Sequence, residues 1–170
     1  MTDLSDLYSE RILALAAAIP RTARLDAPDA TAEAHSKLCG SAVTVDLKMQ
    51  DGAVVDYGQT IKACLLGQTA ASVMGREIIG RGADELRALR ADMQAMLKDD
   101  GPPPSGDWAD LAVLETVRDY PQRHVSAMLV FDAVVDAIGQ IEGARTPDGS
   151  SESESPAEAT TRGSVSELVS

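Results

Sequence analysis

The sequence predicts an α+β fold in which a small antiparallel β-sheet packs against a layer of helices. One β-hairpin, at residues 42–49 and 54–61, stands among five segments with helical character. A single hairpin supplies too few strands for a parallel α/β sheet, in which strands and helices alternate. The 170-residue chain is 44% hydrophobic but only 3% aromatic, so we expect one core built mainly from aliphatic side chains.

Alternating apolar and polar residues define the hairpin. In residues 42–49 every second position is apolar, which predicts a strand with one buried face formed by Val43, Val45, Leu47 and Met49. Asp51-Gly52 follows and suits the type I′ turn of a two-residue hairpin loop. Residues 54–61 are therefore predicted to return as the second strand.

Five segments are expected to be helical, namely 3–19, 68–79, 83–97, 108–117 and 122–141. Apolar residues recur there at three- and four-residue steps, most clearly in the first and third segments. The first helix should end before Pro20, and consecutive prolines make 98–106 a surface loop. Residues 21–38 have no clear period and are expected to form a loop with a short edge strand.

The composition changes at Gly143, beyond which Ser, Glu, Thr, Pro and Gly dominate. Such a segment buries too little apolar surface to offset the entropy of ordering it. We therefore predict a single domain at residues 1–142 and a disordered acidic tail at 143–170.

The charge of the chain argues against several classes of partner. A formal net charge of −12 and a pI near 4.4 oppose binding to phosphate backbones, so no nucleic acid is expected. We expect that no apolar stretch approaches the roughly 18 to 20 residues of a membrane span, and the acidic N-terminal residues do not resemble a secretory signal, so we expect a cytoplasmic protein without a membrane partner. Asp46 and Asp56 alternate with the apolar strand positions and are expected to be solvated.

The two cysteines flank the hairpin. Cys39 precedes its first strand and Cys64 follows its second, so antiparallel pairing should bring both to one end of the sheet. In a reducing compartment both remain thiols, and each is either a small buried hydrophobe or a ligand and nucleophile. Gly40 is read in two ways, as an ordinary turn residue or as a residue that lets backbone amides approach the Cys39 thiolate.

An ordered set of short motifs resembles the NifU/IscU/SufU-type iron–sulfur cluster assembly scaffold proteins. The likeness covers about residues 4 to 141, and a long interval with a proline-rich insertion before Ser126 is most similar to the SufU subgroup. The motifs are Leu7-Tyr8, Pro20-Arg21, Cys39-Gly40, the hairpin, Cys64, a small-residue helix and Tyr120-Pro121-Gln122-Arg123.

The resemblance implies a metal site at the end of the hairpin, formed by three thiolates and one carboxylate or histidine. Cys39 and Cys64 match two of these ligands, but Ser41 stands where the family has aspartate and Ser126 where it has the third cysteine. A serine hydroxyl is a poor ligand for zinc or iron because it is rarely deprotonated.

Two histidines are candidate replacements for the missing ligands. His124, two residues before Ser126, is the stronger candidate; the alternative is an ordinary, partly exposed histidine at a helix start. His35, four residues before Cys39, is the weaker candidate.

Two functions are therefore expected. In the first, the chain is a scaffold or sulfur acceptor rather than a stand-alone enzyme: Cys39 and Cys64 bind zinc, iron or a transient iron–sulfur cluster, a cysteine desulfurase supplies sulfur, and acceptor apo-proteins receive the product. A homodimer would complete a cluster with four thiolates. In the second, a degenerate paralogue serves as a metal-free binding or regulatory module. A hydrolase built on Ser126 and His124 is disfavoured because no nucleophile-elbow sequence surrounds the serine.

Overall fold

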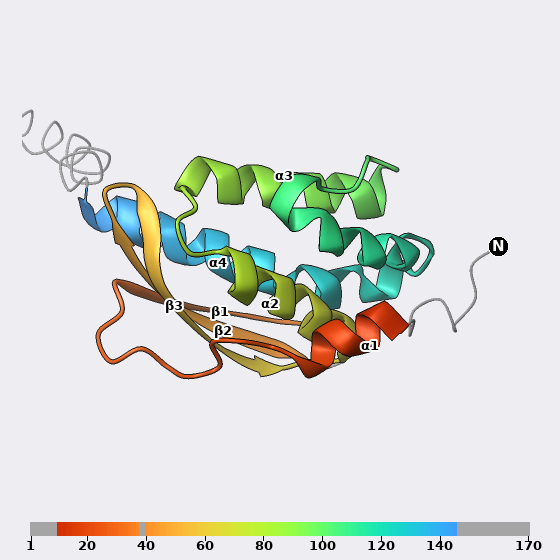
Figure 1. The fold of residues 1–170 in the computed structure, drawn as a ribbon, viewed down its shortest axis with the longest axis horizontal. Coiled ribbons are helices and arrows are strands. Elements are labelled where there is room, and N and C mark those ends of the chain that lie inside the picture. Colours follow the sequence, from red (N-terminus) through yellow and green to blue (C-terminus); the bar gives the residue numbers. More distant parts are fainter. Residues whose placement is uncertain (1–9, 38–39, 146–170) are drawn as a thin grey trace, which may run out of the picture.

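The computed structural model describes residues 10–37 and 40–145, and it confirms the α+β class. Figure 1 shows the helices gathered on one side of a three-stranded sheet. In chain order the elements are α1 (Glu10–Ala17), β1 (Ala30–His35), β2 (Ala42–Gln50), β3 (Ala53–Lys62), α2 (Leu65–Glu77), α3 (Ala83–Lys98), the 3₁₀ helices η2 (Gly106–Asp119) and η3 (Pro121–Arg123), and α4 (His124–Arg145).

The sheet is antiparallel in the order β1-β2-β3, and its central pair is the predicted hairpin. Asp51 and Gly52 both have positive φ, 56° and 83°, as the type I′ turn requires. The edge strand expected within residues 21–38 is β1, whose His35 pairs with Ala42 at one end of the sheet. Ala42 in turn pairs with Lys62 on β3, so His35, Ala42 and Lys62 lie side by side across the three strands.

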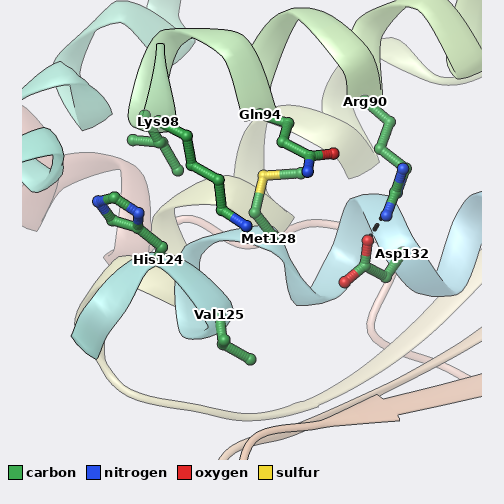
Figure 2. A pocket seen from close by; sticks show the side chains of 8 residues that line it. Arg90, Gln94, Lys98, His124, Val125, Met128 and Asp132 are labelled. Carbon is green, nitrogen blue, oxygen red and sulfur yellow. Dashed lines mark hydrogen bonds and ion pairs between the residues drawn. The ribbon is translucent and has the colours of Figure 1, made fainter. Parts of the chain in front are cut away.

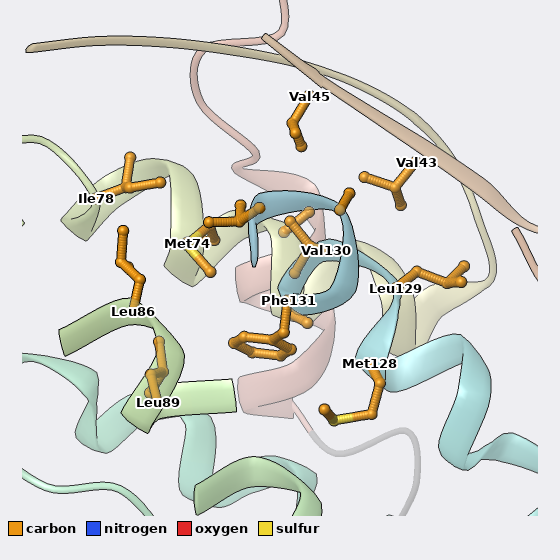
Figure 3. Close-up of a cluster of buried hydrophobic side chains, with 14 of the residues drawn as sticks. Val43, Val45, Met74, Ile78, Leu86, Leu89, Met128, Leu129, Val130 and Phe131 are labelled. Atoms are coloured by element: carbon orange, nitrogen blue, oxygen red, sulfur yellow. The ribbon is translucent and has the colours of Figure 1, made fainter. Parts of the chain in front are cut away.

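The core lies between the sheet and the helices. The four apolar residues of β2 that were expected to face inward are buried, with exposures of 0 to 6%. Figure 3 shows Val43 and Val45 from the sheet above Val130 and Phe131 of α4 and Met74 of α2. Helix α4 contacts β1 and β2, while α2 and α3 pack on α4. The sheet is therefore covered on this face by α4 and α2.

A strap at residues 18–29 begins on the helical side, passes along the edge of β3 and continues over the opposite face of the sheet. The carbonyl of Arg21 accepts a hydrogen bond from the Gln59 N–H at 2.9 Å, and the Gln59 side chain donates to the carbonyl of Pro20 at 3.0 Å. Gly58 is required here because a Cβ at this position would overlap the backbone carbonyl of Ala23. The loop that connects α1 to β1 is thus held against the sheet.

Asp46 lies under this strap, and the expectation that it is solvated was wrong. Its side chain is fully buried, and it accepts hydrogen bonds from Arg24 at 2.6 and 3.1 Å, from the Thr31 hydroxyl at 2.6 Å and from the Leu25 N–H at 3.0 Å. Burial by itself would raise the pKa of Asp46, but these hydrogen bonds and the positive charge of Arg24 hold the pKa below its ordinary value. Asp56 is half-buried, and its carboxylate accepts the N–H of Tyr57 at 2.9 Å.

Several element boundaries differ from the predicted ones. The predicted residues 3–9 of the first helix lie outside the described residues, and α2 begins at Leu65, earlier than expected. Helix α4 extends to Arg145, past the position where the tail was expected to begin; residues 146–170 lie outside the described part of the chain.

The segment expected as a helix at 108–117 is a 3₁₀ helix, η2. Its buried residues recur at every third position, Trp108, Leu111, Leu114 and Val117. A 3₁₀ helix has three residues per turn, so this spacing places all four on one face.

Within the described residues, the segment Pro121–Gly143 has the length and apolar composition of a membrane span, so the expectation that no apolar stretch approaches this length was wrong. In this fold 67% of its apolar window is buried, as in the core helix of a folded domain. Length and composition are therefore weak evidence for a membrane span here.

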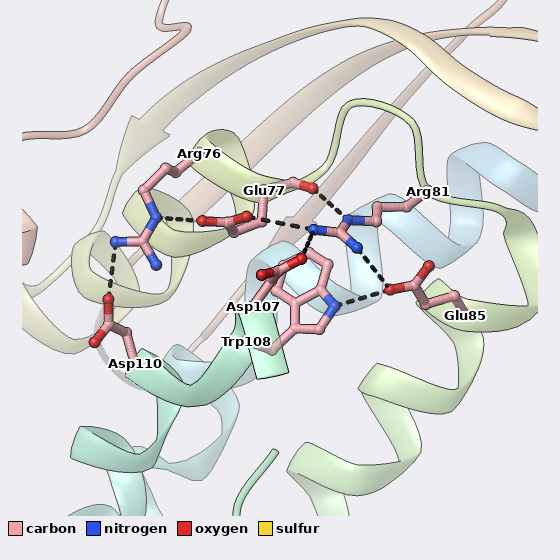
Figure 4. Close-up of polar contacts among 7 residues, drawn as sticks. All are labelled: Arg76, Glu77, Arg81, Glu85, Asp107, Trp108 and Asp110. Atoms are coloured by element: carbon pink, nitrogen blue, oxygen red, sulfur yellow. Dashed lines mark hydrogen bonds and ion pairs between the residues drawn. The ribbon is translucent and has the colours of Figure 1, made fainter. Parts of the chain in front are cut away.

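A polar network joins the C-terminal end of α2 to the first turns of α3 and η2. Arg81 pairs with Glu77 at 3.3 Å and with Asp107 at 2.7 Å, and its guanidinium stacks over the Trp108 ring at 5.3 Å from the centroid. The Trp108 indole donates to Glu85 at 3.1 Å. Figure 4 shows Arg81 at the centre of these contacts. It thereby ties the first turn of η2 to the loop between α2 and α3.

Candidate functional site

The site expected from the sequence lies where β2 begins and β3 ends. Two backbone hydrogen bonds close the connection from β1 to β2: Ser36 N–H to the Ser41 carbonyl at 2.8 Å and Gly40 N–H to the Ser36 carbonyl at 2.9 Å. Gly40 adopts φ of 71°, a left-handed conformation that glycine accepts without strain. Cys39 belongs to this connection in the sequence but lies, with Leu38, outside the described residues.

Cys64 occupies the N-cap position of α2, immediately after β3. Its backbone is extended, its side chain is half-buried, and its thiol is free. The Cys64 N–H donates to the Ser41 hydroxyl at 3.2 Å. The start of β2 and the start of α2, 23 residues apart in sequence, are thus in direct contact.

Ser126 lies beside the first turn of α2. Its side chain is buried, and its backbone carbonyl lies 3.1 Å from the position that a Cβ would take on Gly67. The same Cβ would lie 2.8 Å from the Cβ of Ala63. Gly67 is therefore what allows the first turns of α2 and α4 to approach each other.

His124 is directed away from α2. Its ring is 8% exposed, not partly exposed as the alternative reading expected, and Nε2 lies 3.1 and 3.2 Å from the carbonyl oxygens of Val117 and Arg118. Carbonyl oxygens only accept hydrogen bonds, so Nε2 carries the proton that it donates to them. In a neutral ring the lone pair is then on Nδ1.

The ring of His124 lines a groove between α3 and α4. The groove has a volume of about 100 Å³ and is lined by Arg90, Gln94, Leu97, Lys98, His124, Val125, Met128 and Asp132. Figure 2 shows Lys98 extending from α3 towards α4 beside His124, with the Arg90–Asp132 ion pair at the other end of the groove. A second depression, of about 510 Å³, adjoins the groove and shares Leu97, Lys98, His124 and Val125 with it.

The remaining candidate, His35, is exposed at the end of β1, in the same row of the sheet as Ala42 and Lys62. Within residues 10–37 and 40–145, no group of three or more His, Cys, Asp or Glu side chains is placed to hold a metal ion. The described part of the site thus brings together the thiol-bearing Cys64 and the hydroxyl of Ser41. Ser126 lies beside Gly67, which is one turn of α2 further along from Cys64.

Comparison with known proteins supports one family. No family model matches the chain. The crystal structure of the N-terminal part of a NifU-like nitrogen-fixing protein from Brucella abortus is 55% identical, covers 82% of this chain and 96% of its own, and superimposes with a TM-score of 0.80.

Curated relatives agree with this structure. The iron–sulfur cluster assembly scaffold protein IscU of Thermotoga maritima is 27% identical over 135 residues, which are 79% of this chain and 94% of the relative. The protein of the same name from Streptococcus pyogenes is 23% identical over 68% of this chain and 72% of its own length.

A putative scaffold protein for the SUF system from Fervidobacterium islandicum AW-1 shares the fold, with a TM-score of 0.72 and 19% identity over 79% of this chain and 98% of its own. The fold, the ordered motifs and the 55% identity to the Brucella abortus structure agree. The chain therefore belongs to the NifU/IscU/SufU-type family of iron–sulfur cluster assembly scaffold proteins.

Proposed function

We propose that this protein is an iron–sulfur cluster assembly scaffold that accepts sulfur from a cysteine desulfurase and passes its product to acceptor apo-proteins. The observation that carries the proposal is the contact between Ser41 and Cys64 in a chain of this family. This contact places the residue that follows Cys39-Gly40 against the N-cap of α2, where the second thiol is found.

Cys39 and Cys64 are the proposed ligands of iron, of a nascent cluster or of zinc. Thiolates suit all three, whereas the hydroxyls of Ser41 and Ser126 are poor ligands. The Ser41 hydroxyl already accepts the Cys64 N–H, and His124 donates through Nε2 to backbone carbonyls on the far side of α4 from α2. These contacts favour an arrangement in which two protomers each contribute Cys39 and Cys64 to one two-iron cluster.

Sulfur acceptance needs only one of the two thiolates. The thiolate attacks the terminal sulfur of the persulfide on the desulfurase cysteine, the sulfur–sulfur bond of that persulfide breaks, and the desulfurase cysteine leaves as a thiolate. Cys64 is half-buried, so part of the residue lies at the surface, where such a donor binds.

The test is the iron, sulfide and zinc content of protein purified and reconstituted without oxygen. We expect stoichiometric metal in the wild type and its loss in Cys39→Ala and in Cys64→Ala. Sedimentation should show that the metal-loaded form is a dimer and the metal-free form a monomer. His124→Ala separates the arrangements, because a single-chain site completed by His124 predicts a monomer that loses its metal in this variant.

A second candidate function is a metal-free binding or regulatory module. Serine at both Ser41 and Ser126 favours it, because both replace stronger ligands of the family pattern. Ser126→Cys distinguishes the candidates, since a degenerate site should gain zinc affinity from the added thiol while the wild type binds none. Wild-type metal content that depends on Cys39 and Cys64 would contradict the module.

A further inference from the structure

The lysines of this chain differ from its arginines in their ion pairing. Most described arginines pair with a carboxylate: Arg11, Arg24, Arg76, Arg81, Arg87, Arg90 and Arg118. Within the described part of the chain, no ion pair involves Lys37, Lys48, Lys62 or Lys98. Among the described residues, the four lysines are therefore without a paired carboxylate, whereas seven arginines have one and Arg21 and Arg123 do not.

Two of these lysines lie beside the Ser41–Cys64 contact. His35, Ala42 and Lys62 form one row across the three strands, and neighbouring strands are about 4.8 Å apart. His35 and Lys62 are exposed, and Lys37 is exposed two residues after His35, in the connection that the Ser36–Ser41 hydrogen bond closes. These three residues, His35, Lys37 and Lys62, are called the basic patch below.

Acidic groups near the basic patch are few on the same face of the sheet. Glu33 lies two residues before His35 on β1, where its carboxylate accepts the Thr44 hydroxyl at 3.5 Å. Asp46, further along β2, is neutralised by Arg24. Lys98 is left out of the patch because it lies on the helical side, next to the exposed Asp99 and Asp100.

We propose that the basic patch is a docking surface for an acidic region of the protein that delivers sulfur to this chain, an inference that rests on the proposed function. A net charge of −12 repels an acidic partner from most of the surface. The unpaired Lys37 and Lys62 attract the partner to that end and orient it, because complementary charge acts mainly on the association rate. Cys64 follows Lys62 by two residues, so the partner arrives at the thiol.

The test is the association rate with the cysteine desulfurase, measured by stopped-flow fluorescence at 0.05 M and 0.5 M NaCl. We expect Lys37→Glu/Lys62→Glu to lower the rate about tenfold at low salt, within the range known for electrostatic steering, and the difference to shrink at high salt. Lys48→Glu is the control for position, with one charge reversed instead of two: it reverses an unpaired lysine on β2 near the hairpin turn, at the opposite end of the sheet. We expect it to change the rate less than twofold.

The outcomes separate the docking surface from the proposed function. Thermal unfolding of each variant checks that the fold is retained, and mass spectrometry of alkylated protein measures persulfide on Cys39 and Cys64. Equal rates for the patch variant and Lys48→Glu, with normal sulfur acceptance, overturn the docking surface and leave the proposed function intact. A wild type that neither binds the desulfurase nor accepts sulfur overturns the proposed function and this inference with it.

Discussion

The hydroxyl of Ser41 accepts a hydrogen bond from the backbone N–H of Cys64 at 3.2 Å. Cys64 is the N-cap of α2, and its own side chain makes no capping hydrogen bond. Ser41, the residue immediately before β2, thus fixes the backbone of the thiol-bearing residue from a distant part of the sequence. In this chain the serine at the position of the family aspartate has a structural role that does not require a metal.

Ser41→Ala removes this acceptor and should lower the free energy of unfolding by about 1 kcal/mol, because the partly buried N–H of Cys64 loses its partner. Denaturant unfolding measures the change. Thr44→Ala, three residues further along the chain on β2, is the control, since its hydroxyl makes only a 3.5 Å exposed contact, and should cost less than about 0.5 kcal/mol. Equal costs for the two variants would show that the Ser41 contact does not matter.

Gly67→Ala should destabilise the protein by about 1 to 3 kcal/mol, although alanine has the higher helix propensity. The added methyl would lie 2.8 Å from the Ala63 Cβ and 3.1 Å from the Ser126 carbonyl, so α2 and α4 would have to separate. Gly139→Ala in α4 is the matched control, with open space around the new methyl, and should stabilise by up to about 1 kcal/mol. Thermal unfolding of both variants decides whether the close approach at Gly67 is real.

Asp46→Asn should lower the free energy of unfolding at pH 7 by about 2 kcal/mol, because hydrogen bonds to a charged carboxylate are replaced by neutral ones. The pKa of Asp46 is lowered in the folded state, so its contribution is present above the ordinary value of 3.8 and is lost as pH falls through the folded pKa. The stability difference between wild type and variant should therefore be constant from pH 7 to about pH 5 and shrink below about pH 4. A difference that grows on acidification would contradict the assigned pKa direction.

Arg81→Met should change the fluorescence of Trp108, the single tryptophan, and lower the free energy of unfolding by about 1 to 2 kcal/mol. The arginine both stacks on the indole and pairs with Asp107 and Glu77. Arg87→Met is the control, because its pair with Glu142 is exposed, and should cost less than about 1 kcal/mol. Unchanged emission in Arg81→Met would exclude the stacking.

The sequence by itself determined the hairpin, the α+β class and the family. Alternation at Val43, Val45, Leu47 and Met49 and the turn at Asp51-Gly52 are local properties, and they specify which face of β2 is buried wherever the strand packs. The ordered motifs predicted a family that the 55% identity to the Brucella abortus structure then confirmed.

Only the tertiary structure decided what the polar residues do. Asp46 alternates with core residues, yet the strap at 18–29 passes over it and supplies Arg24, a contact between residues 22 apart that no local pattern encodes. His124 is two residues from Ser126, but a helix turns about 200° over two residues, so one faces α3 and η2 while the other lies by α2. Local periodicity predicts which side chains are buried, whereas the partner that a buried polar group finds depends on how distant elements pack.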